Sequence, residues 1–396
     1  MVCIEKICSE ICKNMNNVYT HQKKSRSSNI ELLRIAAMMM IILHHMVVHC
    51  IYVQLTDASS IARMNNGLFN HPLFYKKLLI LASIVPVGVV GNVLFILISG
   101  YFMISKGKNI DLGKTSKKLL FQLFFAAIIL VMIPALWHGL DKHIFINTLE
   151  IRIANSMAWF VGYYFLVIVI AASFLNEYLC RLDQNGYQTF LIVSFAIVQF
   201  SFSGSLADGL TGGLRTLLTG IFLYALGGYI RLYDPLKKIR NYVFSGILVM
   251  TFLLVCISSH NVTVKNIQYY YRNNSTADFI QQIPAYENHS IIAIVIGVAI
   301  FEIFRRIHIQ NNRIINSLGK STFMVYLLHD NDFFYSIWNT QDWITLLYYH
   351  PYLFIGKILI WSSAVFGIGT LVYFIYEKTG NLLEKYKWLV LKSEHC

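Results

Sequence analysis

The sequence predicts an all-α integral membrane protein of about ten transmembrane helices. Of its 396 residues, 56% are hydrophobic and 13% are charged, whereas soluble domains carry about 25% charged residues. The apolar residues gather in long runs, and such runs cross about 30 Å of hydrocarbon at about 1.5 Å per residue. The composition therefore excludes a soluble enzyme with a single membrane anchor.

Ten apolar runs account for the predicted helices, and the fifth of them is short. They cover residues 29–50, 78–104, 119–137, 159–179, 189–202, 214–230, 242–259, 291–307, 321–338 and 353–376. These runs make up one predicted membrane domain over residues 29–376. A basic cytoplasmic arm is predicted over residues 1–28, and a cytoplasmic tail over residues 377–396.

The formal net charge of +13 follows from the predicted topology. With the N-terminus inside, 23 of the 33 Lys and Arg residues fall on the cytoplasmic side and 8 fall in outer loops; Arg34 and Lys357 lie within helices. This bias is what the positive-inside rule expects. We therefore expect a multi-pass protein of the cell's plasma (inner) membrane with both termini in the cytoplasm, surrounded by membrane lipids and with no nucleic-acid partner.

The first predicted helix carries ionisable residues, which are costly in hydrocarbon and point to a functional site. Arg34 and His45 are eleven residues apart, so they share one helix face, about 16 Å apart along the axis. Arg34 falls near the cytoplasmic interface and His45 near mid-membrane. The structural alternatives are that Arg34 extends to lipid phosphates and that His45 is a hydrogen-bonded packing residue.

The ninth run places another histidine, His329, at a similar depth, followed by Asp330 and Asp332. Three ionisable groups so close together are hard to reconcile with a lipid-facing position. The alternative is that the two aspartates mark an early outer end of this helix.

Four features in chain order resemble the family-three membrane acyltransferases, integral-membrane enzymes that acylate cell-surface glycans. The first is the pair Arg34 and His45. The others are the stretch LFILISGYFMIS with Ser99 and Tyr101, the stretch AWFVGYYFLVIVI with Trp159, and LGKSTFMVYLLH ending at His329. Together they extend over nearly the whole hydrophobic body, so the resemblance implies a membrane O-acyltransferase.

Acyl transfer from a thioester to a hydroxyl needs a base, donors for the oxyanion and a grip on the acyl carrier. Histidine suits the first role, because its usual pKa of about 6.5 lets it accept a proton at neutral pH. We expect His45 to act as general base or as a nucleophile that briefly carries the acyl group. Arg34, with Lys117 and Lys118, is expected to hold the phosphates or pantetheine arm of acetyl-CoA. Many family members carry arginines at the start of the third helix, where this chain has lysines, which lack bidentate geometry.

The acceptor is expected to be a hydroxyl of a surface polysaccharide or of its lipid-linked precursor. The residues expected to bind this acceptor lie in the motifs above or directly after the last of them. They are Ser99, Tyr101, Trp159, His329 and Asp330. Helix packing at Gly100 and a position in the interfacial aromatic belt are the alternatives for the Ser99–Tyr101 stretch and for Trp159.

Two rival functions fit the same composition. One is an exporter of polysaccharide or lipid precursor without acyl-transfer chemistry, and the other is a membrane subunit that packs against glycan-synthesis machinery. The seven scattered cysteines show no metal-binding spacing, so no metal is expected. No residue in the sequence measures acyl length, so a succinyl or longer donor stays open beside acetyl-CoA.

Overall fold

The computed structural model describes residues 27–56, 72–107, 110–138, 159–200, 212–273, 287 and 289–393. Its described elements are all helical, and short π or 3-10 turns interrupt several of the helices. In chain order they are α2 (Ser28–Met46), η1 (Val47–Ile51), α3 (Tyr52–Thr56), α5 (Pro72–Ile84), α6 (Val87–Met103), η2 (Ile104–Lys106), α7 (Leu112–His138), α9 (Trp159–Ile170), η3 (Ala171–Leu175), α10 (Asn176–Arg181), α11 (Gln184–Phe200), α13 (Gly212–Tyr233), α14 (Asn241–Asn273), α15 (Ile291–Arg306), α16 (Arg313–His329), α17 (Asp332–Asn339), α18 (Trp343–Tyr349) and α19 (Pro351–Ser393).

All ten predicted runs are mainly helical over their described residues, with non-helical positions at 85–86, 307 and 330–331. Seven of the described helices are long and apolar enough to cross a membrane. The helices α11, α15 and α16 have only 17, 16 and 17 residues. The chain is thus a polytopic all-α membrane protein, and the count of ten crossings stays a prediction.

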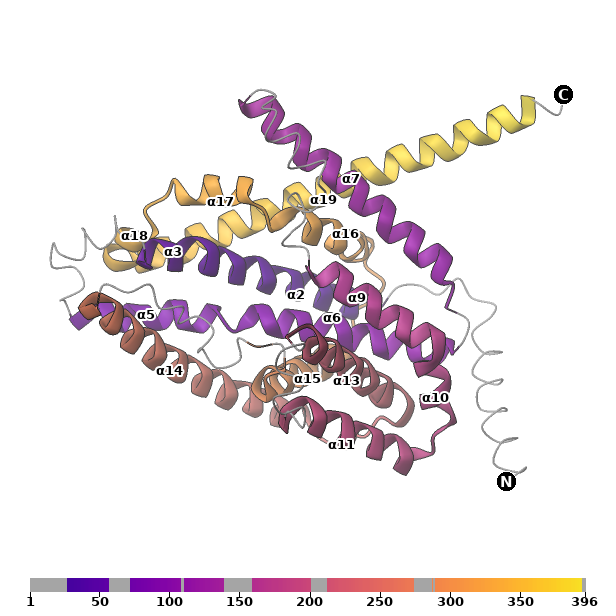
Figure 1. Cartoon of the computed structure of the whole chain (residues 1–396), viewed down its shortest axis with the longest axis horizontal. Coiled ribbons are helices and arrows are strands. Elements are labelled where there is room, and N and C mark those ends of the chain that lie inside the picture. Colours follow the sequence, from indigo (N-terminus) through magenta and orange to yellow (C-terminus); the bar gives the residue numbers. More distant parts are fainter. Residues whose placement is uncertain are drawn as a thin grey trace.

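Helix α2 lies at the centre of the bundle, where it packs against α6, α15, α16 and α19 (Figure 1). On the other side of α6, helix α13 approaches so closely that a Cβ atom at Gly100 would collide with the Tyr224 carbonyl. Small residues allow this kind of backbone approach between membrane helices. Gly100, in the middle of the Ser-Gly-Tyr stretch, therefore serves helix packing.

Helix α7 and the C-terminal part of α19 project from the bundle (Figure 1). Along α7, large apolar side chains are half or more exposed, namely Leu120, Phe121, Phe124, Ile128, Met132 and Leu136. In a protein of this composition such a surface faces lipid. Helix α7 contacts α16, and the residues of α7 that line the site described below all belong to its first part.

The ninth predicted run, residues 321–338, is not one helix. Helix α16 ends at His329, and α17 begins at Asp332 after a short break. The Asn331 side chain caps α17 by accepting a hydrogen bond from the backbone N–H of Phe334 at 3.2 Å. Asparagine is a favoured cap because its short side chain satisfies a free N–H group. The aspartates therefore do mark an early helix end, as the structural alternative held.

The two predicted terminal segments differ in what the structure covers. Residues 1–26 of the predicted cytoplasmic arm lie outside the described residues, and α2 already begins at Ser28. At the other end α19 continues without a break to Ser393. Most of the predicted tail is therefore a helical extension of the last membrane run.

Candidate active site

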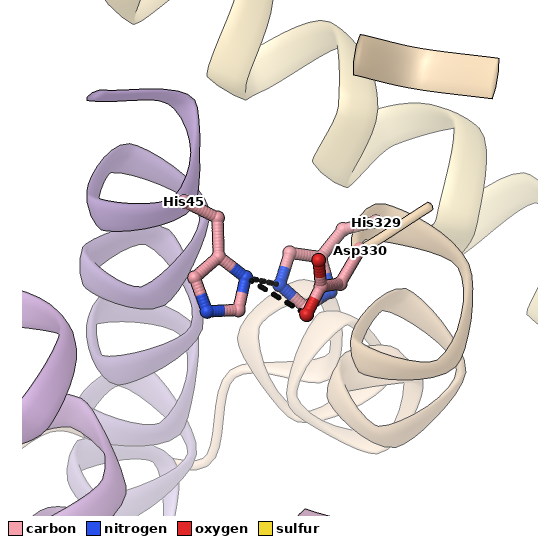
Figure 2. A group of neighbouring side chains, drawn as sticks. All are labelled: His45, His329 and Asp330. Atoms are coloured by element: carbon pink, nitrogen blue, oxygen red, sulfur yellow. Dashed lines mark hydrogen bonds and ion pairs between the residues drawn. The ribbon is translucent and has the colours of Figure 1, made fainter. Parts of the chain in front are cut away.

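His45 and His329 lie side by side between α2 and the end of α16 (Figure 2). The Nδ1 atom of His45 is 2.9 Å from Nε2 of His329. The two rings are nearly parallel, with an interplanar angle of 5° and centroids 4.9 Å apart. This separation is that of a hydrogen bond, so one nitrogen donates and the other accepts.

The backbone carbonyl of Tyr326, next to the His329 ring, decides which of the two facing nitrogens donates. Nδ1 of His329 lies 2.7 Å from the Tyr326 carbonyl oxygen, and because a carbonyl only accepts, this nitrogen carries the proton. In a neutral ring, Nε2 of His329 is then an acceptor, and His45 must donate from Nδ1. The lone pair of His45 is thereby placed on Nε2, the ring nitrogen turned away from His329 in Figure 2.

Asp330 completes this cluster. Its Oδ2 atom is 3.3 Å from Nδ1 of His45, and its Oδ1 atom accepts a hydrogen bond from the Tyr335 hydroxyl. Asp330 is only 8% exposed and His329 is fully buried. A carboxylate in this position holds the imidazole in one orientation and stabilises the positive charge that develops when Nε2 takes a proton.

The two other histidines of the first span lie around His45. The ring of His49 meets the ring of His45 edge-on and stacks on that of Tyr335, with centroids 5.5 and 4.8 Å apart. His49 belongs to the π-helix η1, and such irregular turns are frequent at functional sites. His44 instead hydrogen-bonds the Val85 carbonyl at the break between α5 and α6, which gives it a structural role.

Arg34 lines a cavity of about 410 Å³ between α2, α6, α7, α9 and α16. Its Nη1 atom donates a 2.8 Å hydrogen bond to Glu31, whose side chain is 6% exposed. Glu31 packs against Gly319, where a Cβ atom would collide with the carboxylate. The buried carboxylate thus fixes the guanidinium at the wall of the cavity.

Four cationic side chains line this cavity together with polar and aromatic ones. The lining residues are Arg34, Phe95, Ser99, Lys114, Thr115, Lys118, Leu119, Gln122, Phe160, Tyr164, Gly319, Lys320, Thr322, Phe323 and Tyr326. Clustered cations with hydrogen-bond donors are the lining expected around phosphate groups.

Tyr326 connects the cavity to the histidine cluster. Its side chain lines the cavity, its hydroxyl accepts a hydrogen bond from the backbone N–H of Phe160 at 3.3 Å, and its carbonyl holds Nδ1 of His329. The rings of Tyr326 and His329 have centroids 5.4 Å apart. Tyr326 therefore joins the wall of the cationic cavity to His329, and His329 in turn contacts His45.

The structure brings some of the other expected site residues to this region and not others. Ser99 lines the cavity and donates a 3.2 Å hydrogen bond to the Tyr164 hydroxyl. Trp159 lines a second cavity of about 720 Å³ with Tyr163 and Thr216. The Tyr101 hydroxyl accepts a hydrogen bond from Arg231 at 3.1 Å and does not line the first cavity.

The lysines at the start of α7 separate by helix face. Lys118 lines the cavity, whereas Lys117 does not and lies over the Phe121 ring, 5.8 Å from its centroid. Lys114, Lys118 and Gln122 are spaced four residues apart and share one face. The spacing groups Lys114 and Gln122 with Lys118, and the packing of α7 shows that this face meets the cavity. Lys320 carries no comparable signal, because only the packing of α16 brings it to the cavity.

His45, His329 and Asp330 also form a group that could hold a metal ion, since one ligand atom of each lies within 4.8 Å of the others. Two nitrogens bound to one zinc ion at about 2.0–2.1 Å in a tetrahedral site stand about 3.4 Å apart. The 2.9 Å between the two facing nitrogens is instead a hydrogen-bond separation. The geometry favours a hydrogen-bonded acid–base cluster.

The model of an acyltransferase domain family matches residues 27–377 of this chain. The chain belongs to the acyltransferase 3 family. The matched residues include the histidine cluster, Arg34 and every residue that lines the cavity. No curated protein and no solved structure matches the chain. As an acyltransferase 3 protein with several membrane-crossing helices, it is a multi-pass membrane acyltransferase.

Proposed function

We propose that this acyltransferase transfers an acetyl group from acetyl-CoA to a hydroxyl of a surface polysaccharide or its lipid-linked precursor. The observation that carries the proposal is the connection between two sites: a cavity lined by four cations, and a histidine whose basic nitrogen is oriented by His329 and Asp330. The cavity suits the phosphates of a CoA thioester. The histidine suits deprotonation of an alcohol.

The distance between the two sites fits such a donor. Arg34 and His45 are eleven residues apart on one helix, which corresponds to about 16 Å along its axis. An extended pantetheine arm has a comparable reach, so phosphates bound beside Arg34 would leave the thioester near the histidine cluster. With Arg34 at the cytoplasmic end, as the positive-inside bias predicts, acetyl-CoA enters from the cytoplasm.

In the one-step route, Nε2 of His45 takes the hydroxyl proton while the alcohol oxygen attacks the thioester carbonyl carbon. Asp330, 3.3 Å from Nδ1, stabilises the resulting imidazolium. The tetrahedral intermediate collapses, the C–S bond breaks, and the imidazolium proton passes to the leaving CoA thiolate. In the two-step route, Nε2 itself attacks the thioester carbonyl carbon, the C–S bond breaks, and CoA leaves as the thiolate. The alcohol oxygen then attacks the acyl carbon, the C–N bond to His45 breaks, and the alcohol proton passes to the freed Nε2 and from there to the thiolate.

The test is the O-acetyl content of surface glycan, measured by proton NMR of purified polysaccharide. Cells that lack the gene are complemented with the wild type, His45→Ala or Arg34→Ala at matched membrane levels. The exposed residues His308 and Arg313 supply matched controls as His308→Ala and Arg313→Ala. We expect acetyl signal with the wild type and both controls, and with neither site variant.

Two results would contradict this proposal. Full acetylation with His45→Ala would remove His45 from the chemistry. If the amount of polymer changes and its acetylation does not change under any condition, the exporter function is supported and acyl transfer is not.

A further inference from the structure

A second cavity, of about 720 Å³, lies between the N-terminal parts of α9 and α13. Its lining residues are Trp159, Tyr163, Leu166, Gly213, Leu214, Thr216 and Leu217. The volume falls within the range of about 300–1,000 Å³ that is usual for ligand pockets. Trp159, Leu166 and Leu214 are 43%, 50% and 48% exposed. A ligand can therefore reach this cavity from outside the fold.

The lining of this cavity is uncharged, in contrast to that of the first one. None of the described residues that line it is charged, whereas four cations line the first cavity. Phosphate groups bind most strongly to cationic side chains. The two cavities therefore suit different ligands, and the second one suits a neutral ligand.

Trp159 and Tyr163 give the second cavity an aromatic wall. They are four residues apart on one face of α9, and their rings have centroids 5.7 Å apart with an interplanar angle of 38°. Gly220 of α13 makes room for Tyr163, because a Cβ atom there would lie 2.7 Å from the phenol oxygen. Neither the indole N–H nor the phenol hydroxyl bonds to another described residue. The wall thus combines apolar ring faces with free hydrogen-bonding groups.

A sugar ring has the matching chemistry. Its faces carry C–H groups, which pack on aromatic rings, and its edge carries hydroxyls, which both donate and accept hydrogen bonds. A hydrocarbon chain would fill the same space but would leave the indole N–H and the phenol hydroxyl unpaired. The lining therefore favours a carbohydrate.

Phe160 separates this cavity from the cationic one. It lines the cationic cavity, and its ring centroid is 5.4 Å from that of Tyr163. Its backbone N–H donates to the hydroxyl of Tyr326, one helical turn before His329. In the topology that the positive-inside bias predicts, α9 and α13 both begin at the outer side of the membrane. The second cavity thus adjoins the proposed donor cavity and lies toward the side where a surface glycan is found.

We propose that this second cavity binds a sugar unit of the acceptor glycan, with its ring packed on Trp159 and its hydroxyls bonded to Tyr163 and the indole N–H. This inference rests on the proposed function and gives the acceptor a binding site. A glycan extends over several sugar units, so a unit held here leaves a neighbouring unit free to reach His45. Donor and acceptor then bind on opposite sides of Phe160.

The test is saturation-transfer-difference NMR of the full-length protein in micelles of a detergent without a sugar headgroup. The probe is an oligosaccharide released by mild hydrolysis from polysaccharide of cells that lack the gene. We expect saturation transfer to its ring protons with the wild type. Tyr163→Phe removes one hydrogen bond and should weaken binding about fivefold. Trp159→Leu removes the stacking surface and should weaken it about tenfold.

Two exposed aromatic side chains outside the cavity supply matched controls. Tyr352 of α19 is 90% exposed and Phe174 of η3 is 60% exposed, so Tyr352→Phe and Phe174→Leu should leave binding unchanged. In transfer assays, Tyr163→Phe and Trp159→Leu should raise the KM for the oligosaccharide and leave the KM for acetyl-CoA unchanged. A merely structural role would change both.

The inference would be overturned if the wild type gave no saturation transfer, or if both cavity variants bound the oligosaccharide as tightly as the wild type. Monodispersity and melting temperature show whether each variant is folded. Tyr163→Phe removes a single oxygen atom and keeps the inference testable even where Trp159→Leu does not fold. Failure of the proposed function has a different result: the oligosaccharide then binds, but the wild type neither acetylates it nor releases CoA from acetyl-CoA.

Discussion

Nε2 of His329 lies 2.9 Å from Nδ1 of His45, although 284 residues separate the two in the chain. The contact joins the first membrane span to the end of α16 and places the His45 lone pair on Nε2. In the proposed mechanism, His329 therefore acts through His45, as a positioning residue.

His45→Ala should lower kcat for acetyl transfer by about 10²–10⁴-fold, the usual contribution of a general base. His329→Ala should have a smaller effect, about 10–100-fold, because it frees the tautomer and orientation of His45 without removing the base. Steady-state kinetics on matched amounts of folded protein distinguish the two. A His329→Ala loss as large as that of His45→Ala would show that His329 itself contacts the reacting atoms.

Asp330→Asn should lower kcat with little change in the KM for acetyl-CoA. Its carboxylate contacts His45 and lies away from the cavity lining, and its charge stabilises the imidazolium that forms during the reaction. Tyr335→Phe removes the hydroxyl that donates to the other oxygen of the Asp330 carboxylate. It should also lower kcat, by less than Asp330→Asn does. The assignment would be wrong if Asp330→Asn raised KM and left kcat unchanged.

Gly319→Ala should weaken binding of acetyl-CoA. A Cβ atom there collides with the Glu31 carboxylate, and displacement of Glu31 releases Arg34 from its 2.8 Å hydrogen bond. Overpacking of this kind also destabilises a fold by about 1–3 kcal/mol. The exposed Gly367 of α19 provides the control, because a Cβ atom there meets nothing within 4 Å. Calorimetric titration of CoA into both variants should show weaker binding for Gly319→Ala alone.

Lys118→Ala should raise the KM for acetyl-CoA more than Lys117→Ala does. Only Lys118 of the two lines the cavity, and Lys117 lies over the Phe121 ring on another face. The difference should shrink at high salt, because salt screens partly exposed charges. Equal effects of both substitutions would mean that the lysines act through the general positive charge of this membrane face.

Treatment with a strong chelator should leave the rate of acetyl transfer unchanged. The nitrogens of His45 and His329 face each other at hydrogen-bond distance, which leaves no room for an ion between them. Loss of activity on chelation, with recovery after addition of zinc, would show that the cluster binds a metal ion.

The sequence alone predicts the helical class, and it singles out Arg34 and His45 as candidate site residues of the first span, because hydropathy and helical spacing are local properties. It places His329 at the depth of His45, but depth does not determine which helices are neighbours. The contact between α2 and α16 arises from packing and carries no local signal. The four-residue spacing groups Lys114, Lys118 and Gln122 on one face of α7, but only the packing shows that this face, and not that of Lys117, meets the cavity.

The central claim is that His45 accepts the proton of the acceptor hydroxyl during transfer from acetyl-CoA. The most direct measurement is CoA release by purified full-length protein in proteoliposomes, supplied with acetyl-CoA and with polysaccharide purified from cells that lack the gene. The account predicts that the wild type releases CoA and acetylates the polysaccharide, while His45→Ala does so at least about 100-fold more slowly. A His45→Ala protein that releases CoA and acetylates polysaccharide at the wild-type rate would contradict it.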